Sequence, residues 1–270
     1  IADAAALNAV FESEKPQAVL HLAAQAGVRY SLENPSAYVQ TNLVGFANLL
    51  ECCRRHPPRH LVYASSSSVY GNNPELPWTE SQNVDHPISL YAATKKSNEL
   101  MAHVYSHLYG LHATGLRYFT VYGPWGRPDM AYWLFTKAIL QREPIRVFNH
   151  GNLWRDFTYI DDLAESIVRL TDAIPGREPV EGDSLSPVAP FRSVNIGNGQ
   201  PTPLMDYIGA LEQALGRTAI KNYLPMQQGD VPATEASSAL LERLTGYKPS
   251  TPPAQGVARF VDWYLEHYRT

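Results

Sequence analysis

Tyr91 and Lys95 stand four residues apart in the segment Y-A-A-T-K, and four serines, residues 65–68, precede them at the end of an apolar run. In a helix this spacing places both side chains on one face. A nearby ammonium favours the phenolate, so we expect Lys95 to move the pKa of Tyr91 from about 10 towards neutral pH. A phenol tuned in this way can act as a general base towards an alcohol.

The elements that position these groups follow from the pattern around them. The apolar run from His60 to Ala64 is bounded by serines and Gly71, which predicts a buried strand with Ser66 at its C-terminal edge. Tyr-x-x-x-Lys alone occurs by chance on many surface helices. With a cluster of serines at a strand end 25 residues earlier, the evidence that Tyr91 and Lys95 are functional becomes much stronger.

Composition limits the class of protein. With 270 residues, 44% apolar and 18% charged, the chain can bury one α/β core and a small second lobe. The net charge of −4 argues against a nucleic-acid partner, and no apolar run is long enough to span a membrane. Cys52 and Cys53 are neighbours in a helical pattern, which favours free thiols in a reducing compartment. No metal site is expected, because no Cys/His spacing of the zinc type is present.

Strand and helix patterns alternate along the chain. Extended apolar runs predict strands, and apolar residues at helical spacing predict helices. The predicted strands are residues 16–22, 60–64, 112–118, 145–148 and 193–197; the predicted helices are residues 3–14, 35–56, 130–141, 203–215 and 257–268. Residues 175–192, rich in Pro, Gly and Ser, predict an exposed loop.

The serines at a strand end, followed by Tyr-x-x-x-Lys, resemble the pattern of the extended short-chain dehydrogenase/reductases, in their nucleotide-sugar epimerase and dehydratase branch. The resemblance implies a catalytic set of Ser66, Tyr91 and Lys95. The resemblance runs from Ile1 to about Tyr268 and is closest to the UDP-glucuronate 4-epimerases. It implies an α/β fold with a Rossmann-like, doubly wound parallel sheet and a smaller C-terminal α/β substrate lobe. It also implies NAD as cofactor, a UDP-sugar substrate, and a homodimer formed through two helices, one bearing Tyr91 and Lys95.

The resemblance further implies a division of the chain. Residues 1–122, with part of 155–200, correspond to the NAD-binding domain, and residues 123–154 and 201–270 mainly to the nucleotide-sugar lobe. Members of the family begin with a strand and a G-x-x-G-x-x-G turn, which is absent from these 270 residues. We therefore expect that the first half of the nucleotide-binding sheet is missing here. A cytoplasmic location is expected, and a targeting segment before Ile1 lies outside this prediction.

By resemblance, the cofactor contacts the strand ends and the active-site helix. Small residues after the strand at 16–22 let a dinucleotide approach the backbone; a plain tight turn is the alternative. A buried Asn42, in N-x-x-G, needs partners and supports the site; an ordinary helix-packing role is the alternative. The cofactor-binding residues implied are Leu22, Ala23, Ala24, Gln25, Asn42, Ala64, Ser65, Tyr91, Lys95, Tyr118 and Phe119.

The substrate residues implied by resemblance are Arg29, Ser66, Ser67, Thr120, Arg127, Val147, Phe148, Arg155, Gln227 and Asp230. Arg155 matches a diphosphate-binding arginine, and a purely structural pair with Asp161 or Asp162 is the alternative. UDP-galactose 4-epimerases generally carry Asn where Thr120 stands, which favours an acidic sugar. Residues 235–237, E-A-S, depart from the family pattern, so that edge of the site is less well defined.

The function predicted is NAD-dependent 4-epimerisation between UDP-glucuronate and UDP-galacturonate through a 4-keto sugar. Tyr91 takes the proton of the 4-hydroxyl while C4 gives hydride to NAD. Dehydratases carry Asp-Glu after the catalytic hydroxyl residue and decarboxylases usually carry Glu nearby, whereas Ser67 and Ser68 stand here. The alternatives are a 4-epimerase of a neutral UDP-hexose or UDP-N-acetylhexosamine, and a non-catalytic, truncated nucleotide-sugar-binding protein, which only the missing glycine-rich turn supports.

Overall fold

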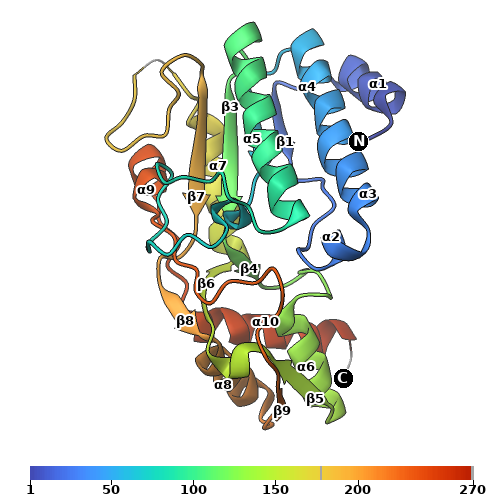
Figure 1. The fold of residues 1–270 in the computed structure, drawn as a ribbon, viewed down its shortest axis with the longest axis vertical. Coiled ribbons are helices and arrows are strands. Elements are labelled where there is room, and N and C mark those ends of the chain that lie inside the picture. Colours follow the sequence, from blue (N-terminus) through green and yellow to red (C-terminus); the bar gives the residue numbers. More distant parts are fainter. Residues whose placement is uncertain (177, 269–270) are drawn as a thin grey trace.

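A four-stranded parallel sheet forms the centre of the larger of two bodies (Figure 1). The computed structural model describes residues 1–176 and 178–268. The strands lie in the order β1 (Ala18–His21), β2 (His60–Ala64), β3 (Ala113–Tyr118) and β7 (Phe191–Ile196), and each neighbouring pair is parallel. β2, β3 and β7 are almost wholly buried, as expected for parallel strands covered on both faces.

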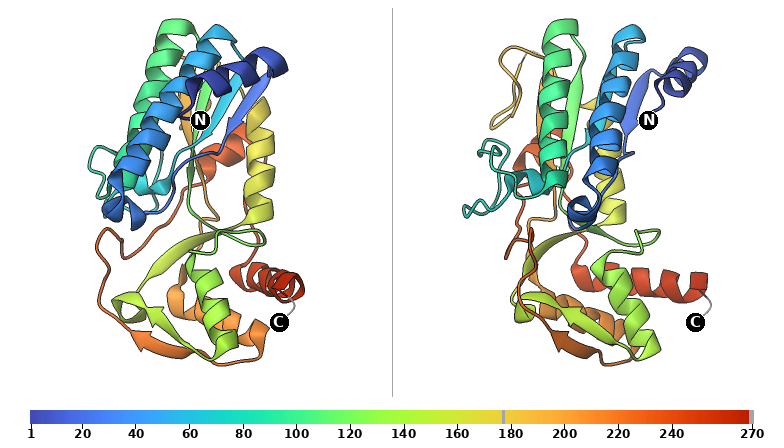
Figure 2. Two further views of the ribbon diagram at one scale, coloured as in Figure 1. Left: turned by 90° about the vertical axis from the view of Figure 1, so that its right-hand side faces the viewer. Right: turned by 45° about the vertical axis from the view of Figure 1, so that its right-hand side comes forward.

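Helices cover both faces of this sheet (Figure 2). On one face lie α1 (Ala4–Glu14), α4 (Gly45–Arg55) and α5 (Leu90–Tyr109). On the other lie α7 (Ile160–Asp172) and α9 (Ala239–Thr245). The sheet is therefore the middle of three layers, and the carboxyl ends of its strands face the smaller body.

The smaller body has its own aromatic core. It contains α6 (Ala131–Gln141), α8 (Leu204–Leu215) and α10 (Pro253–Tyr268), the parallel pair β5 (Pro144–Val147) and β9 (Ile220–Tyr223), and the sheet of β4 (Thr120–Tyr122), β6 (Trp154–Tyr159) and β8 (Pro201–Pro203). Tyr122, Phe157, Tyr207 and Phe260 are buried at its centre. α9 lies in residues 201–270 but packs on the larger body, through Leu240 and Leu241.

Local signals account for the element that carries the chemistry. Ser89 caps α5 by accepting a hydrogen bond from the Ala92 amide at 3.1 Å, and Gly110, with φ 68°, ends it in a left-handed turn. The predicted helix 35–56 is interrupted: α3 (Pro35–Tyr38) continues into a π-helix, Val39–Val44, before α4 begins. The short α2 (Tyr30–Glu33) was not predicted from the sequence.

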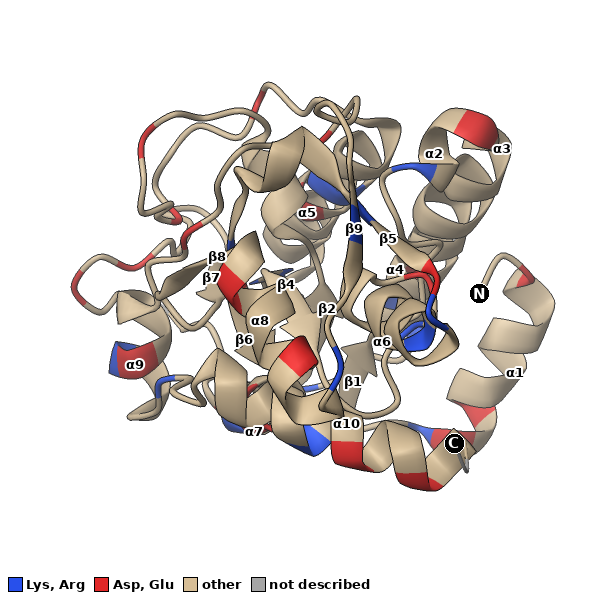
Figure 3. Cartoon of the chain, turned by 90° about the horizontal axis from the view of Figure 1, so that it is seen from below, with Lys and Arg blue, Asp and Glu red and all other residues tan. Residues whose placement is uncertain are grey.

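Charges of both signs are mixed along the chain. Viewed from below, acidic and basic residues are interspersed over most elements (Figure 3). Among the described residues, no helix combines the length and the apolar character that crossing a membrane requires.

Candidate active site

Tyr91 and Ser66 meet where β2 ends and α5 begins. Ser66 follows β2, is 8% exposed, and caps the 3-10 helix Ser67–Tyr70 by accepting a hydrogen bond from the Ser68 amide at 3.1 Å. Its side chain also lies next to that of Tyr91, in the first turn of α5, and acts to lower the pKa of Tyr91. The ring of Tyr38 packs edge-on against Tyr91 at 6.2 Å. The hydroxyl pair predicted from the sequence is therefore assembled at the carboxyl edge of the sheet.

Burial raises the pKa of Tyr91, while the neighbouring Ser66 side chain and the positive charge of Arg127 act in the opposite direction. The expectation that Lys95 lowers this pKa is wrong. The reason is geometric, because the Lys95 ammonium is turned towards β2 and donates to the Ala64 carbonyl at 2.7 Å. Arg127, from a loop 36 residues away, supplies the cation that favours phenolate.

The Lys95 ammonium fits the hydroxyl groups of a dinucleotide ribose. The residue is only 3% exposed, and burial lowers its pKa to about 8. An ammonium has three N–H donors, and within the described residues the Ala64 carbonyl is its one acceptor. Two donors are left for a bound ligand, and the small side chains of Ala23 and Ala24 leave the backbone after β1 accessible.

The buried Lys95 predicts a pH-dependent stability. At pH 7 the folded chain bears the full cost of a buried charge; between pH 8 and the ordinary pKa of 10.5 the folded state releases the proton first and the cost falls. Lys95→Met should therefore raise the free energy of unfolding by on the order of 2 kcal/mol at pH 7, with a smaller gain at pH 10. Urea unfolding between these pH values measures it. Lys96→Met is the control, and a gain that grows with pH contradicts the prediction.

Asn42 joins the loop after β1 to α5. Its side chain accepts from the Gln25 amide at 2.8 Å and donates to the Gln25 carbonyl and to Thr94 Oγ1, both at 3.0 Å. Its own carbonyl, within the π-helix, accepts from Asn98 at 2.7 Å. These contacts confirm that Asn42 is buried with partners and supports the loop, and they exceed what helix packing alone requires.

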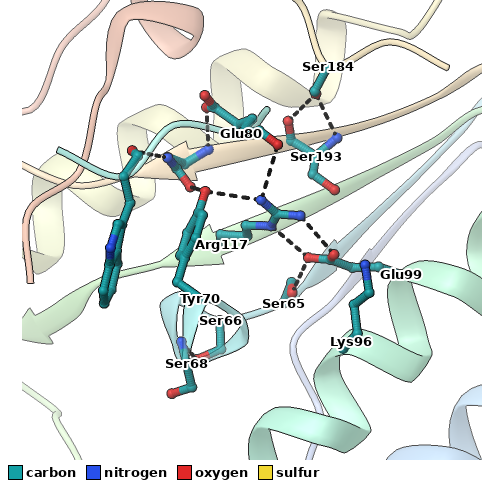
Figure 4. A network of polar contacts seen from close by, with 12 residues as sticks. Ser65, Ser66, Ser68, Tyr70, Glu80, Lys96, Glu99, Arg117, Ser184 and Ser193 are labelled. Carbon is teal, nitrogen blue, oxygen red and sulfur yellow. Dashed lines mark hydrogen bonds and ion pairs between the residues drawn. The ribbon is translucent and has the colours of Figure 1, made fainter. Parts of the chain in front are cut away.

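A buried polar network lies directly behind the serines (Figure 4). Ser65 donates to Glu99 at 2.7 Å, and Arg117 forms two hydrogen bonds of 2.9 Å with the same carboxylate. Arg117 also donates to the Tyr70 hydroxyl at 3.0 Å, which in turn donates to Asn195 at 2.8 Å. This network was not predicted from the sequence, although an arginine inside the apolar run L-R-Y was its signal. With its hydroxyl bound to Glu99, Ser65 offers a cofactor its backbone.

Residues predicted to bind substrate meet from distant parts of the sequence. Arg155, on β6, forms an ion pair of 2.6 Å with Asp230. The guanidinium of Arg29 lies 5.1 Å from the centre of the Phe148 ring. Within the described chain, the side-chain oxygen of Gln227 is buried without a partner. Four of the ten predicted residues thus form two pairs across long stretches of sequence, Arg155 with Asp230 and Arg29 with Phe148.

The alternative partners proposed for Arg155 are wrong. Asp162 instead accepts hydrogen bonds from the Tyr247 hydroxyl at 2.9 Å and from the amides of Ser250 and Thr251 at 3.1 and 2.8 Å. Its carboxylate therefore anchors the chain between α9 and α10.

The other predicted residues take varied positions. Thr120 begins β4, Ser67 begins the 3-10 helix, and both are half-buried. Arg127 is exposed and pairs with Asp129 at 3.0 Å. Buried Val147 ends β5, and its carbonyl accepts from the Leu224 amide at 2.9 Å.

Three predicted cofactor residues lie around the sheet edge. Leu22 is exposed directly after β1. The Tyr118 hydroxyl, at the end of β3, is buried without a partner in the described chain. Phe119 is buried and its ring lies 6.0 Å from that of Trp78. Residues 1–176 and 178–268 hold no cluster of metal-ligating side chains.

Comparison with known proteins identifies relatives over nearly the whole chain. Protein CapI of Staphylococcus aureus is 56% identical over 97% of this chain and 80% of its own length. A probable UDP-glucuronate 4-epimerase of Rhizobium meliloti (strain 1021) is 57% identical over 99% of this chain and 80% of its length. The crystal structure of UDP-glucuronic acid 4-epimerase from Bacillus cereus, with UDP-glucuronic acid and NAD, superposes with a TM-score of 0.86 at 32% identity, over 97% of this chain and 79% of that one.

The family model described as the NAD dependent epimerase/dehydratase family matches residues 1–181. This match covers the sheet strands β1 to β3, the loop held by Asn42, and the pair of Ser66 and Tyr91. The chain belongs to the NAD dependent epimerase/dehydratase family.

Proposed function

We infer that the chain is an NAD-dependent 4-epimerase that interconverts UDP-glucuronate and UDP-galacturonate through a 4-keto sugar. The observation that carries this conclusion is the adjacent pair of Ser66 and Tyr91 at the carboxyl edge of the sheet, with the buried Lys95 one turn further along α5. It occurs in a chain 57% identical to a probable UDP-glucuronate 4-epimerase.

Each catalytic group has one task in this proposal. Tyr91 takes the proton from the sugar 4-hydroxyl, and Ser66 orients that hydroxyl and relays the proton. The cation of Arg127 and the neighbouring Ser66 side chain both favour the phenolate that this step requires. Lys95 holds the nicotinamide ribose through its two free N–H groups. NAD, when bound, would supply the group that accepts the hydride from the sugar C4 and gives it back to the opposite face.

The other predicted residues divide between the two ligands in the same proposal. Residues 1–122, with part of 155–200, hold the dinucleotide, and residues 123–154 with most of 201–270 hold the UDP-sugar. Arg155 and Arg29 supply cations for the diphosphate, because two phosphates in a cleft need fixed positive partners. Phe148 and the backbone at Val147 face the uracil, and the unpartnered Gln227 oxygen offers an acceptor to the nucleotide.

The 4-keto uronic acid is a β-keto acid and can lose carbon dioxide. In that side reaction the C5–C6 bond breaks, its electron pair enters the C4 carbonyl system, and a proton is later taken up at C5. It requires the carboxylate bond to align with the carbonyl π-system. We propose that Thr120, Ser67 and Arg127 hold the carboxylate out of this alignment by hydrogen bonding.

Thr120→Ala should raise the share of decarboxylated pentose product by about tenfold, since one hydrogen bond to a charged group is worth about 1.5–3 kcal/mol. Thr120→Ser, which keeps the hydroxyl, is the matched control. Chromatography of the UDP-sugar products measures the ratio. An unchanged ratio in Thr120→Ala would remove this residue from the carboxylate site.

The function is tested by a proton NMR time course of UDP-glucuronic acid with NAD and the protein. We expect a galacturonic anomeric signal that grows to a stable ratio, without net NADH. If UDP-glucuronic acid is unchanged but UDP-glucose or UDP-N-acetylglucosamine is epimerised, the substrate assignment is wrong. If all three remain unchanged, the protein is a nucleotide-sugar-binding protein without this activity.

We also propose that the enzyme is a homodimer that pairs through α5. Leu100, Val104 and Leu108 lie at four-residue spacing on this helix and are 57%, 49% and 61% exposed, an apolar line typical of a helix interface. Light scattering of Val104→Lys tests the pairing, because a charge in this line should give the monomer mass. The free thiols of Cys52 and Cys53 accord with a cytoplasmic location, which we likewise propose.

A further inference from the structure

The loop of residues 123–130 joins β4 to α6 and carries Arg127. A Cβ added at Gly126 would collide with the Tyr132 hydroxyl, so the loop rests directly on α6 there. The preceding residue, Trp125, has φ 61° and is 75% exposed. A bulky residue in the left-handed region is strained and persists only where neighbouring contacts hold it.

The contacts of Trp125 come from the last turns of α10. Its ring lies 5.3 Å from that of Trp263 and 4.9 Å from that of His267. Trp263 and His267 stack on each other at 5.1 Å with an interplanar angle of 14°. Such ring pairs contribute beyond the apolar area they bury. We call Trp125, Trp263 and His267 the aromatic clamp.

The far end of the same loop borders the proton-transfer site. Arg127 pairs with Asp129 at 3.0 Å. A Cβ built at Gly27 would lie 3.9 Å from the Asp129 carboxylate and 3.7 Å from the Tyr38 hydroxyl. Tyr38 in turn packs edge-on against Tyr91 at 6.2 Å. The loop therefore contacts α10 near one end and the wall of the active site near the other. Arg127 lies two residues after Trp125 of the clamp.

We propose that the aromatic clamp positions Arg127 for the carboxylate of the sugar, so that the C-terminal helix influences the choice between epimerisation and loss of carbon dioxide. The proposal rests on the proposed function. Trp125, Trp263 and His267 are positioning residues, because they act through the loop. Because Trp125 is largely exposed, burial of its side chain does little to offset the strain of its backbone. The ring contacts with α10 therefore hold this conformation.

The test compares Trp125→Ala and His267→Ala with the wild-type protein on UDP-glucuronic acid. We expect the ratio of pentose to epimer, and the KM, to rise about fivefold in each variant, with a smaller change in kcat. His267→Phe keeps a stacking ring and should restore wild-type values. Glu266→Ala, an exposed neighbour on α10, is the control for a change in that helix. In an Arg127→Ala background, Trp125→Ala should have no further effect.

An unchanged product ratio and an unchanged KM in both variants would refute the proposed role of the clamp. The proposed function would still hold in that case, provided that the wild-type protein epimerises UDP-glucuronic acid. An equal effect of Trp125→Ala with and without Arg127 would also overturn it, since the clamp would then act by another route. Absence of epimerisation in the wild-type protein would refute the proposed function, and the clamp's role with it.

Discussion

Tyr91→Phe should lower kcat by about 10³-fold, while the affinity for UDP stays close to that of the wild type. The hydroxyl is the only group that the variant removes, and the ring, which packs against Tyr38 at 6.2 Å, remains. Ser66 keeps its contact with the Ser68 amide, so the shape of the site is preserved. The rate loss is measured by NMR of UDP-glucuronic acid and the affinity by calorimetry with UDP.

Tyr63→Phe is the matched control for this variant. Tyr63 is fully buried on β2, and its hydroxyl has no partner within the described residues, so its removal should leave turnover unchanged. If Tyr91→Phe still epimerises at a rate near that of the wild type, Tyr91 is not the proton acceptor and another group of the site must be.

Glu99→Ala should lower the free energy of unfolding by about 3–5 kcal/mol, because it leaves the guanidinium of Arg117 buried without its counter-charge. Both side chains are 5% exposed, and Arg117 lies within β3 at the centre of the sheet. Burial would lower the pKa of Arg117, but the charge of Glu99 outweighs it and raises the pKa. Because an arginine keeps its proton at neutral pH, Arg117 stays charged in the variant and bears the cost. Urea unfolding at pH 7 measures the change.

Two comparisons separate this cost from an effect of truncation. The double variant Glu99→Met with Arg117→Met removes both charges and should recover most of the lost stability. Glu165→Ala breaks the exposed pair with Arg169 at 2.6 Å and should change the stability far less. A Glu99→Ala variant that unfolds at the wild-type urea concentration would show that the pair contributes little.

The main elements could be predicted because their signals are local. Apolar runs mark β2 and β3, and the Ser89 cap and Gly110 mark the two ends of α5. The pair of Ser66 and Tyr91 was likewise within reach, since a strand end and a helix start in one α/β unit lie close together.

The remaining features depend on tertiary contacts. The direction of the Lys95 ammonium is set by the carbonyl of Ala64, 31 residues earlier in the chain. The partner of Arg155 is Asp230, 75 residues later, rather than the nearby carboxylates Asp161 and Asp162. The periodic pattern of apolar residues in a sequence carries no information about contacts between residues so far apart in the chain. The π-helix could not be predicted either, because its apolar pattern differs from that of an α-helix by a single residue.

The π-helix of residues 39–44 makes the length of this segment matter more than its composition. Its extra residue appears as a hydrogen bond from the Gly45 amide to the Gln40 carbonyl, five residues back. Deleting one residue would let the helix close with α spacing and turn the part before it by about 100° relative to α4. Tyr38 would then leave the wall beside Tyr91. Val39 and Val44 are 42% and 41% exposed, so substitutions at these positions can accumulate during evolution. An insertion or deletion in this segment would instead disrupt the active site.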